Sequence, residues 1–286
     1  MSILVTGATG AFGGRVVSHL LARLPAAEIA VSVRDTGRAA DLAAAGVDVR
    51  QADFDAPDSV RKAFDGIDRL VLVSTNGPDE LRHAQHGTAV RAAADAGVGF
   101  LAYTSVTEAD ADSVAGLADV HGGTERAIRA TGIPFSFLRN TMYHENYTGQ
   151  LAAAYAQGGL VASAGPGRLA SAARDDLAEA AAVVASGTGH DRTVYELTGP
   201  RGWTFEELAA IATEITGRPL RHVDVDDAEL ARVLTAAGLP GFLVETFVAI
   251  HAAIRAGRLA DVRPDLATLL GRPPVDIADA ARAALA

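Results

Sequence analysis

The stretch Met1–Gly14 reads M-S-I-L-V-T-G-A-T-G-A-F-G-G and decides the fold. Its apolar run, Ile3–Val5, is short and soon followed by glycine, which is typical of a buried parallel strand. Valine and leucine then recur at helical spacing over Val16–Leu24. The order strand, glycine turn, helix predicts a dinucleotide site. Glycine lets the backbone approach a pyrophosphate closely, and a helix N-terminus offers unpaired N–H groups.

The glycine spacing in this turn differs from the most familiar fingerprint. Gly7, Gly10 and Gly13 form G-x-x-G-x-x-G, whereas the common dinucleotide motif is G-x-G-x-x-G. A glycine-rich turn before an ordinary helix is therefore an alternative interpretation of the glycines alone. Their position directly after a buried strand favours the nucleotide site.

Composition limits the class of protein. The 286 residues, 49% of them hydrophobic, suffice for one α/β domain with an attached lobe or for two domains. Cysteine is absent, which excludes a disulfide framework, a thiolate nucleophile and a cysteine metal site. The net charge of −10 without a Lys/Arg run argues against a nucleic-acid partner. No apolar run approaches the ~20 residues of a membrane span, and the first strand is too short for a signal peptide. We expect a cytoplasmic protein with no membrane partner.

Strands and helices alternate over the first part of the chain. Further strands are predicted over 28–33, 47–51, 69–74, 100–105 and 135–138, and helices over 38–45, 59–64, 81–96 and 119–131. This alternation predicts an α/β fold with a doubly wound parallel sheet of the Rossmann type. Right-handed crossovers place the C-terminal ends of the strands on one rim, where ligands bind. We expect this domain to span residues 1–140.

The pattern loosens after residue 140. It predicts helices over 151–157 and 175–185, a glycine-rich loop over 158–168, and a strand over 193–197 that returns to the sheet. Thr204 and Glu207 form a capping box at the start of another helix. We expect residues 174–198 or so to complete the first domain and residues 141–286 to form mainly a second lobe.

Charged residues follow two of the predicted strands. Arg34 stands about twenty residues beyond the glycine turn, where an arginine suits the 2′-phosphate of NADP and a carboxylate suits the ribose 2′-hydroxyl of NAD. Asp35 complicates this interpretation, and a solvated charge is the alternative. Asp53 and Phe54 follow the third strand, where they could meet the adenine amino group and ring. A turn aspartate and a core phenylalanine remain an equal alternative.

Several short motifs occur in a familiar order. They are T-G-A-T-G at 6–10, R at 34, Q-A-D-F-D at 51–55, V-S-T at 73–75, A-Y-T-S at 102–105 and F-L-R-N at 137–140. L-A-D-V-H, R-N-T-M-Y-H-E-N-Y, Y-E-L-T-G and W-T-F-E-E-L-A occur as well. With these motifs the chain resembles, almost end to end, the NmrA-like family of atypical short-chain dehydrogenases/reductases. Within that family it is most similar to members that reduce quinones and triphenylmethane dyes. The resemblance implies an NADPH-binding Rossmann domain and a smaller C-terminal substrate-binding lobe.

The resemblance also implies roles for individual residues. The turn from Gly7 to Gly13 lines the pyrophosphate, Ser74 and Thr75 lie beside the nicotinamide ribose, and residues 140–144 lie under the nicotinamide. The complete expected set of cofactor-binding residues is Gly7, Thr9, Gly10, Ala11, Phe12, Gly13, Arg34, Asp53, Phe54, Ser74, Thr75, Thr104, Ser105, Asn140, Thr141, Met142, Tyr143 and Arg174.

The chain departs from its wider superfamily in one respect. Most short-chain dehydrogenases carry Y-x-x-x-K, in which tyrosine donates a proton and lysine lowers its pKa. The corresponding stretch here is His121-Gly-Gly-Thr-Glu125, and Lys62 is the single lysine of the chain. Reducing an ordinary ketone needs that proton relay. A quinone or similar conjugated, electron-poor acceptor takes hydride readily, and solvent can protonate the product. We therefore expect hydride transfer from NADPH to a quinone-like or aromatic small molecule.

Two residues are candidates for a direct part in the reaction. His121 could donate a proton, since its ordinary pKa lies near neutrality, although a lone helical histidine is more often a packing or solvated residue. Tyr143 could stack on the acceptor, with a core position as the equal alternative. The whole cluster 143–147 is expected to overhang the nicotinamide. Further pocket wall is expected from Phe242, Phe247 and His251.

Metal ligation and other functions are weaker predictions. His83 and His86 fall one residue short of a helical i, i+4 pair and lack a third ligand, so we expect no metal site. A redox sensor that binds NAD(P) without turnover is the alternative from a different class, and a pathway-specific reductase of an aromatic metabolite is another enzyme. The complete segment R-N-T-M-Y-H-E-N-Y favours an enzyme. The physiological acceptor and the existence of a homodimer stay open.

Overall fold

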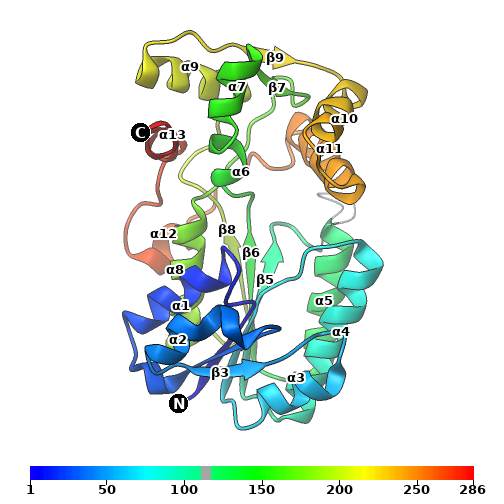
Figure 1. Ribbon diagram of the computed structural model, residues 1–286, viewed down its shortest axis with the longest axis vertical. Helices are drawn as coiled ribbons and strands as arrows, with labels where there is room; N and C mark the ends of the chain where they lie inside the picture. The colour runs from blue at the N-terminus through cyan, green and yellow to red at the C-terminus, as the bar shows by residue number, and fades with distance from the viewer. Residues whose placement is uncertain (111–116) are drawn as a thin grey trace. The chain divides into compact units, whose positions relative to one another are not determined.

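The computed structural model describes residues 1–110 and 117–286. The chain forms two compact units. The first comprises Met1–Val106, Asp119–Arg139 and Leu177–Tyr195. The second comprises Asn140–Asp176, Glu196–Ala286 and the described part of Thr107–Ala118. Figure 1 labels their helices and strands. None of the helices in the described ranges is long and apolar enough to cross a membrane.

A seven-stranded sheet with the order β3-β2-β1-β4-β5-β6-β8 organises the first unit. Its strands are β1 (Ile3–Thr6), β2 (Ile29–Val33), β3 (Asp48–Gln51), β4 (Arg69–Leu72), β5 (Phe100–Val106), β6 (Phe135–Asn140) and β8 (Thr193–Leu197). The pairs from β3 through β5 are parallel, with Ile3 opposite both Ile29 and Arg69. The strand order reverses between β1 and β4, which makes the carboxyl ends of these strands the expected place for a ligand. The predicted doubly wound α/β fold is confirmed.

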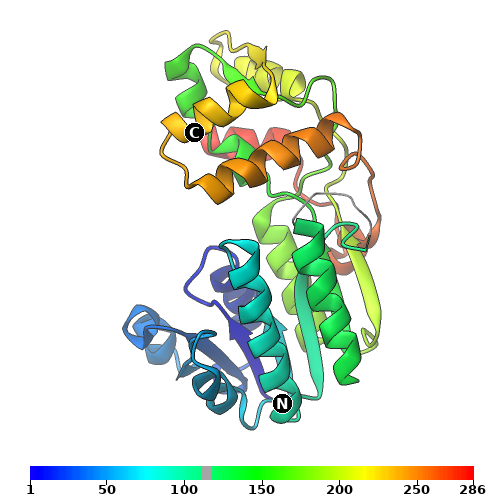
Figure 2. The same ribbon diagram turned by 90° about the vertical axis from the view of Figure 1, so that its right-hand side faces the viewer.

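Helices cover both faces of this sheet. They are α1 (Gly13–Leu21), α2 (Ala40–Ala44), α3 (Pro57–Phe64), α4 (Asp79–Asp95), α5 (Leu117–Thr131) and α8 (Arg174–Ser186), with short 3-10 turns η1 (Ala26–Glu28) and η2 (Thr36–Ala39). Figures 1 and 2 show α1 and α8 on one face and α4 and α5 on the other. Because β1 is covered on both faces, all four of its residues are buried, which explains its unbroken apolar run.

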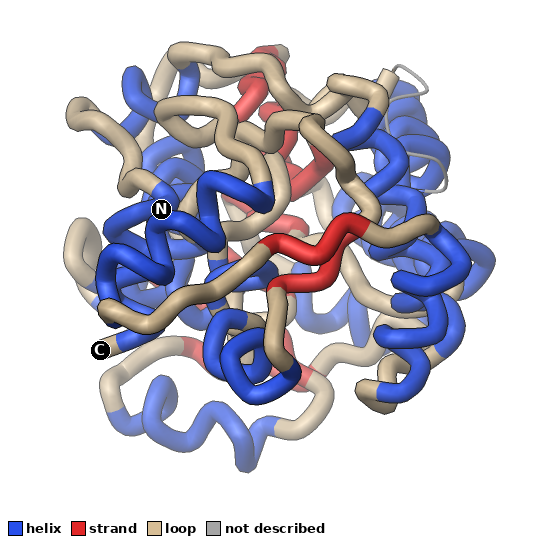
Figure 3. The backbone as a smooth tube through the Cα atoms, turned by 90° about the horizontal axis from the view of Figure 1, so that it is seen from above, coloured by secondary structure: helices blue, strands red, loops and turns tan. Residues whose placement is uncertain are grey.

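The second unit is mainly helical. It contains α6 (Glu145–Thr148), α7 (Leu151–Gln157), α9 (Phe205–Thr216), α10 (Asp227–Ala236), α11 (Gly241–Arg255), α12 (Asp265–Leu270) and α13 (Ile277–Leu285). Helix α9 begins at the predicted cap, where the Thr204 hydroxyl accepts the Glu207 N–H at 3.1 Å. The predicted loop 158–168 is wrong in part, because β7 (Leu160–Ala162) pairs in parallel with β9 (His222–Asp224). Their pairing can be followed in Figure 3. Three residues are too few for an alternating pattern to reveal a strand.

Candidate functional site

The glycine turn follows β1 and is built by close backbone approach. Gly7 has φ +62°, a conformation that side chains disfavour, and its carbonyl accepts the Gly10 N–H at 2.9 Å. A Cβ on Gly13 would lie 2.4 Å from the Gly7 carbonyl oxygen, whereas one on Gly10 would lie 3.2 Å from it. The first glycine therefore makes the turn, and the third lets the helix start against it.

The start of α1 is electrostatically suited to an anion. No side chain caps the helix at Phe12, and its first turn carries no acidic residue. The start of such a helix lies at the positive end of the helix dipole, which favours a phosphate. The Gly14 N–H already donates to the Gly10 carbonyl at 3.0 Å. Thr9 and Ala11 are exposed, whereas Phe12 and Gly13 are buried, so these two can serve a ligand only through the backbone. The turn fits a pyrophosphate.

Arg34 and Asp35 have different surroundings. Arg34 is exposed immediately after β2. The Asp35 carboxylate caps η2 and accepts the Gly37 N–H at 2.9 Å. The carboxylate is thus engaged in the local turn, and recognition of a phosphate by Arg34 stays a prediction.

Asp53 and Phe54 both have local partners. The Asp53 carboxylate accepts the Asp55 N–H at 3.1 Å. Phe54 is half-buried and packs against the core on the α3 and α4 side of the sheet. These contacts favour the turn-and-core alternative for both residues, and their contact with adenine stays a prediction.

The segment after β4, residues 73–75, is held by side chains instead of by a neighbouring strand. Each successive N–H of this segment donates to a side chain from a different element: Val73 to Thr6 Oγ1 at 2.9 Å, Ser74 to Thr104 Oγ1 at 2.8 Å, and Thr75 to His86 Nε2 at 3.0 Å. Ser74 and Thr75 remain half-buried, whereas Thr104 is buried. The Thr104 hydroxyl therefore supports Ser74 from within the protein.

Ser105 belongs to a buried charged cluster. Its hydroxyl donates to the Glu125 carboxylate at 2.7 Å, and Arg139 forms two hydrogen bonds to the same carboxylate at 2.9 and 2.8 Å. Only 1% of the Glu125 surface is exposed. The position that corresponds to the lysine of the usual dyad thus carries a buried carboxylate that neutralises a buried arginine.

His121, at the position of the dyad tyrosine, is also engaged inside the first unit. Its Nε2 lies 3.0 Å from Nη2 of Arg82, and its Nδ1 lies 2.8 Å from the Tyr103 hydroxyl. Arginine can only donate, so Nε2 accepts and Nδ1 carries the proton. Burial, reinforced by the Arg82 charge, lowers the pKa of His121 well below its usual value. A neutral histidine with both nitrogens engaged matches the packing alternative better than a proton donor.

The second unit brings two predicted site residues together. Ala172 donates its N–H to the Met142 carbonyl at 3.0 Å and accepts the His144 N–H at 2.8 Å. This pairing places the Arg174 guanidinium 4.8 Å from the centre of the half-buried Tyr143 ring. Burial raises the pKa of Tyr143 to about 12, although Arg174 opposes that rise, so Tyr143 is a neutral phenol at neutral pH.

Asn140, the last residue of β6, has an unusual amide. Its Oδ1 is buried and has no hydrogen-bond partner among the described residues. A buried acceptor without a partner is destabilising by about 1–3 kcal/mol. This atom can therefore accept a hydrogen bond from a ligand. The next residue, Thr141, donates its N–H to the Leu197 carbonyl at 3.0 Å.

His144 and Tyr147, which follow Tyr143 in the chain, lie in the core of the second unit. His144 contacts Ser171 Oγ at 2.7 Å and the Val275 carbonyl at 3.1 Å. Tyr147 is 1% exposed and packs edge-on against Trp203. His144 and Tyr147 are thus engaged within the second unit, and the expected overhang of the nicotinamide by residues 143–147 stays a prediction.

The three residues of α11 that are expected to form pocket wall differ in burial. His251 is buried, where its Nδ1 accepts the Ser163 N–H at 3.1 Å. Phe242 and Phe247 are half-buried on the same helix. The contribution of all three residues to an acceptor wall stays a prediction.

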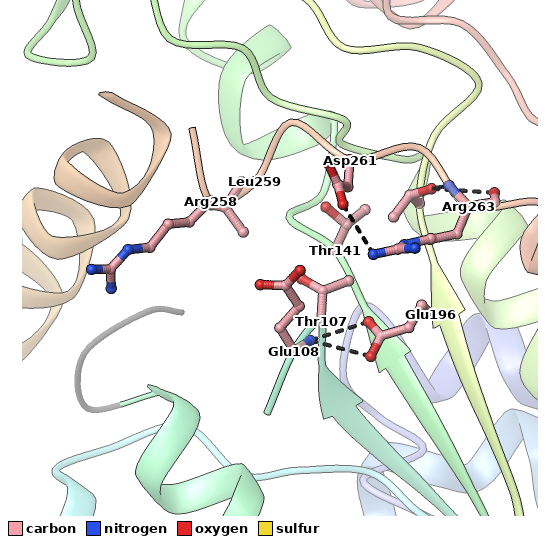
Figure 4. A pocket seen from close by; sticks show the side chains of 9 residues that line it. Thr107, Glu108, Thr141, Glu196, Arg258, Leu259, Asp261 and Arg263 are labelled. Atoms are coloured by element: carbon pink, nitrogen blue, oxygen red, sulfur yellow. Dashed lines mark hydrogen bonds and ion pairs between the residues drawn. The ribbon is translucent and has the colours of Figure 1, made fainter. Parts of the chain in front are cut away.

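Sequence reasoning missed a polar pocket of the second unit, shown in Figure 4. It is lined by Thr107, Glu108, Thr141, Glu196, Thr198, Arg258, Leu259, Asp261 and Arg263. The Glu108 N–H donates to the Glu196 carboxylate at 3.1 Å, and Arg263 pairs with Asp261 at 2.9 Å. Thr141 is the one predicted site residue in this lining. No motif could reveal the pocket, because separate segments contribute its walls. Across the two described ranges, no group of three or more His, Cys, Asp or Glu residues is arranged to hold a metal ion.

Comparison with known proteins extends over nearly the whole chain. The sequence profile of the NmrA-like family matches residues 1–253. Quinone oxidoreductase 2 of Escherichia coli K12 is 38% identical over 97% of this chain and 96% of its own length. The crystal structure of Citrobacter sp. triphenylmethane reductase complexed with NADP(H) superimposes with a TM-score of 0.94 at 39% identity and covers 100% of both chains. That of the E. coli NADPH-dependent quinone oxidoreductase complexed with NADPH gives 0.94 at 38% identity over 98% of each chain. The chain belongs to the NmrA-like family.

Proposed function

We propose that this protein is an NADPH-dependent oxidoreductase that transfers hydride to a quinone or similar conjugated, electron-poor acceptor. One observation carries the proposal. The two positions of the usual proton-relay dyad hold His121 and Glu125, which are buried and engaged with Arg82 and Arg139. The glycine turn fits a dinucleotide, but the two dyad positions supply no relay for an alcohol or ketone.

NADPH is the proposed cofactor. The backbone from Gly7 to Gly13 would hold the pyrophosphate, and Arg34 would pair with the 2′-phosphate. Thr75 and its neighbour Ser74 would lie beside the nicotinamide ribose. When bound, the nicotinamide supplies a hydride, and the protein orients it. The relatives solved with NADP(H) and NADPH support this choice.

The acceptor is expected to need binding more than proton transfer. The Arg174 guanidinium lies over one face of the Tyr143 ring, so a flat acceptor would stack on the other face. The hydride acceptor becomes a phenolate or its equivalent, which water can protonate after the transfer. Much of the rate would come from holding the two reactants in register. The names of the relatives, which refer to quinones and triphenylmethane, support this class of acceptor.

The test measures, by absorbance, the steady-state oxidation of NADPH and of NADH. The acceptors are a panel of benzoquinones, naphthoquinones and cationic dyes. Simple ketones and aldehydes serve as the negative set. We expect turnover with the conjugated acceptors, a preference for NADPH over NADH, and no turnover with simple ketones. Tight NADPH binding without turnover on any acceptor would instead support a sensor that binds the dinucleotide. Reduction of simple ketones at comparable rates would contradict the proposal.

A further inference from the structure

Thr75 is held by side chains at both of its backbone groups. Its N–H donates to His86 Nε2 at 3.0 Å, and its carbonyl accepts Nε–H of Arg82 at 2.8 Å. The Thr75 hydroxyl lies 3.2 Å from the same His86 nitrogen. Arg82 and His86 are four residues apart, and therefore on one face of α4. One helix face thus fixes the orientation of the Thr75 peptide groups.

The tautomer of His86 follows from its second nitrogen. Nδ1 lies 2.9 Å from Thr124 Oγ1, and the Thr124 hydroxyl donates to the Val120 carbonyl at 2.8 Å. The Thr124 oxygen therefore accepts from Nδ1–H, which leaves Nε2 as the acceptor for Thr75. Burial and then the Arg82 charge lower the pKa of His86 to about 3. His86 stays neutral near pH 7 and keeps its acceptor.

Arg82 is held from α5 in the same manner. Its Nη2 donates to His121, so α5 supports both side chains that reach Thr75. Arg82 is only 5% exposed, and the Asp79 carboxylate lies 3.8 Å away and is more than half exposed. A buried charge with such a distant partner is unfavourable unless its hydrogen bonds are satisfied. The Thr75 carbonyl and His121 supply those bonds.

We propose that Arg82, His86, His121 and Thr124 form a clamp whose role is to position Thr75 against the bound cofactor. We call this set the Thr75 clamp. Arg82 and His86 are its direct positioning residues, and His121 and Thr124 fix them. The position that would carry the tyrosine of the dyad has thereby become part of the support for the cofactor segment. The inference rests on the proposed function, because it takes residues 74 and 75 to lie beside the nicotinamide ribose.

The decisive pair of variants is His86→Leu and His86→Gln. Leucine removes the acceptor, whereas the amide oxygen of glutamine can replace Nε2. We expect His86→Leu to weaken NADPH binding several-fold and to lower kcat at saturating NADPH by about 10- to 100-fold, since misplacement near 1 Å has effects of that order. The KM for the acceptor should change little. His86→Gln should restore most of both losses.

The control variant is Ser136→Ala, which removes another buried side-chain hydrogen bond, to the His190 carbonyl at 2.5 Å, on β6. It should leave NADPH affinity and kcat near wild type. A readout independent of activity is amide hydrogen exchange at Thr75. Exchange there should accelerate in His86→Leu and stay slow in His86→Gln and Ser136→Ala.

The clamp would be overturned if His86→Leu folds and keeps the NADPH affinity, kcat and Thr75 exchange of wild type. If His86→Leu does not fold, the double variant Thr124→Val/Tyr103→Phe decides instead, because it removes both hydroxyls near Nδ1, that of Thr124 at 2.9 Å and that of Tyr103 at 3.4 Å, with little change of shape. Wild-type exchange at Thr75 in this double variant would then contradict the inference, and faster exchange would support it. A wild-type protein that binds no NADPH would refute the proposed function, while exchange at Thr75 would still test the clamp.

Discussion

The first unit holds two backbone segments at the carboxyl ends of neighbouring strands, and it holds them in opposite ways. The turn after β1 depends on the absence of side chains at its glycines, since a Cβ at Gly13 would collide with Gly7. Residues 73–75 after β4 are instead held by side chains, because three of them accept hydrogen bonds from the N–H groups of this segment. A segment of the first kind is intolerant of any larger residue. A segment of the second kind depends on hydrogen-bond acceptors that residues distant in the sequence supply.

The largest expected effect breaks the first segment. Gly13→Ala should lower NADPH affinity by on the order of 100-fold, because the new Cβ would lie 2.4 Å from a carbonyl oxygen and the turn must shift. Gly10→Ala, with its closest contact at 3.2 Å, should lower it less. Titration of NADPH by fluorescence, with a thermal melt to verify folding, measures both. Equal affinities for the two variants and wild type would remove the phosphate assignment.

A second prediction sharpens the contrast at β2. Arg34→Ala should weaken NADPH by roughly 10- to 100-fold, the range for a lost charged hydrogen bond of about 1.5–3 kcal/mol. NADH affinity should hardly change. Asp35→Ala is the matched control, since the Asp35 carboxylate caps η2 and should not affect the choice between cofactors. Loss of NADPH and NADH affinity in equal measure would show that Arg34 does not recognise the 2′-phosphate.

The side-chain-built segment should respond to pH, which the glycine turn should not. The depressed folded-state pKa of His86, about 3, means that the unfolded chain binds more protons below its ordinary value of about 6.5. Its contribution is complete above pH 6.5 and declines as pH falls toward 3, by at most about 1.4 kcal/mol per pH unit. Urea unfolding at pH 7.5, 6.0 and 5.0 should show a smaller decline for His86→Gln than for wild type. Parallel declines would contradict the depressed pKa.

The smallest expected effect concerns His121. His121→Gln keeps an acceptor for Arg82, so turnover should fall by no more than a few-fold and the kcat profile between pH 5.5 and 8.5 should keep its shape. A positioned acid contributes about 100-fold or more, which separates the two roles. A hundredfold lower kcat, together with loss of a neutral-pH ionisation present in wild type, would make His121 the acid instead.

The sequence predicted the glycine turn after β1 far better than the segment 73–75, which side chains hold. Glycine spacing, buried strands and alternating helices are local patterns, and they located β1, α1 and the end of β2 correctly. His86 drew notice only as half of an unconvincing metal pair, and Arg82 drew none. Their role depends on how α4 lies against β4 and α5, which no local pattern contains. A weak signal did exist, since His86 shares a helical face with the buried Ala89 and Ala93.

The buried pair Glu125–Arg139 has a consequence for redesign. Converting this protein to an alcohol dehydrogenase would require tyrosine and lysine at positions 121 and 125. A lysine at 125 would lie against two arginines, because Arg139 and Arg129 are 2.8 and 3.4 Å from the present carboxylate. Loss of one partner of a buried pair is destabilising by about 3–5 kcal/mol even before that repulsion. A thermal melt of Glu125→Lys should register this at once. The electrostatics of this buried pair therefore oppose the introduction of a tyrosine–lysine relay at positions 121 and 125.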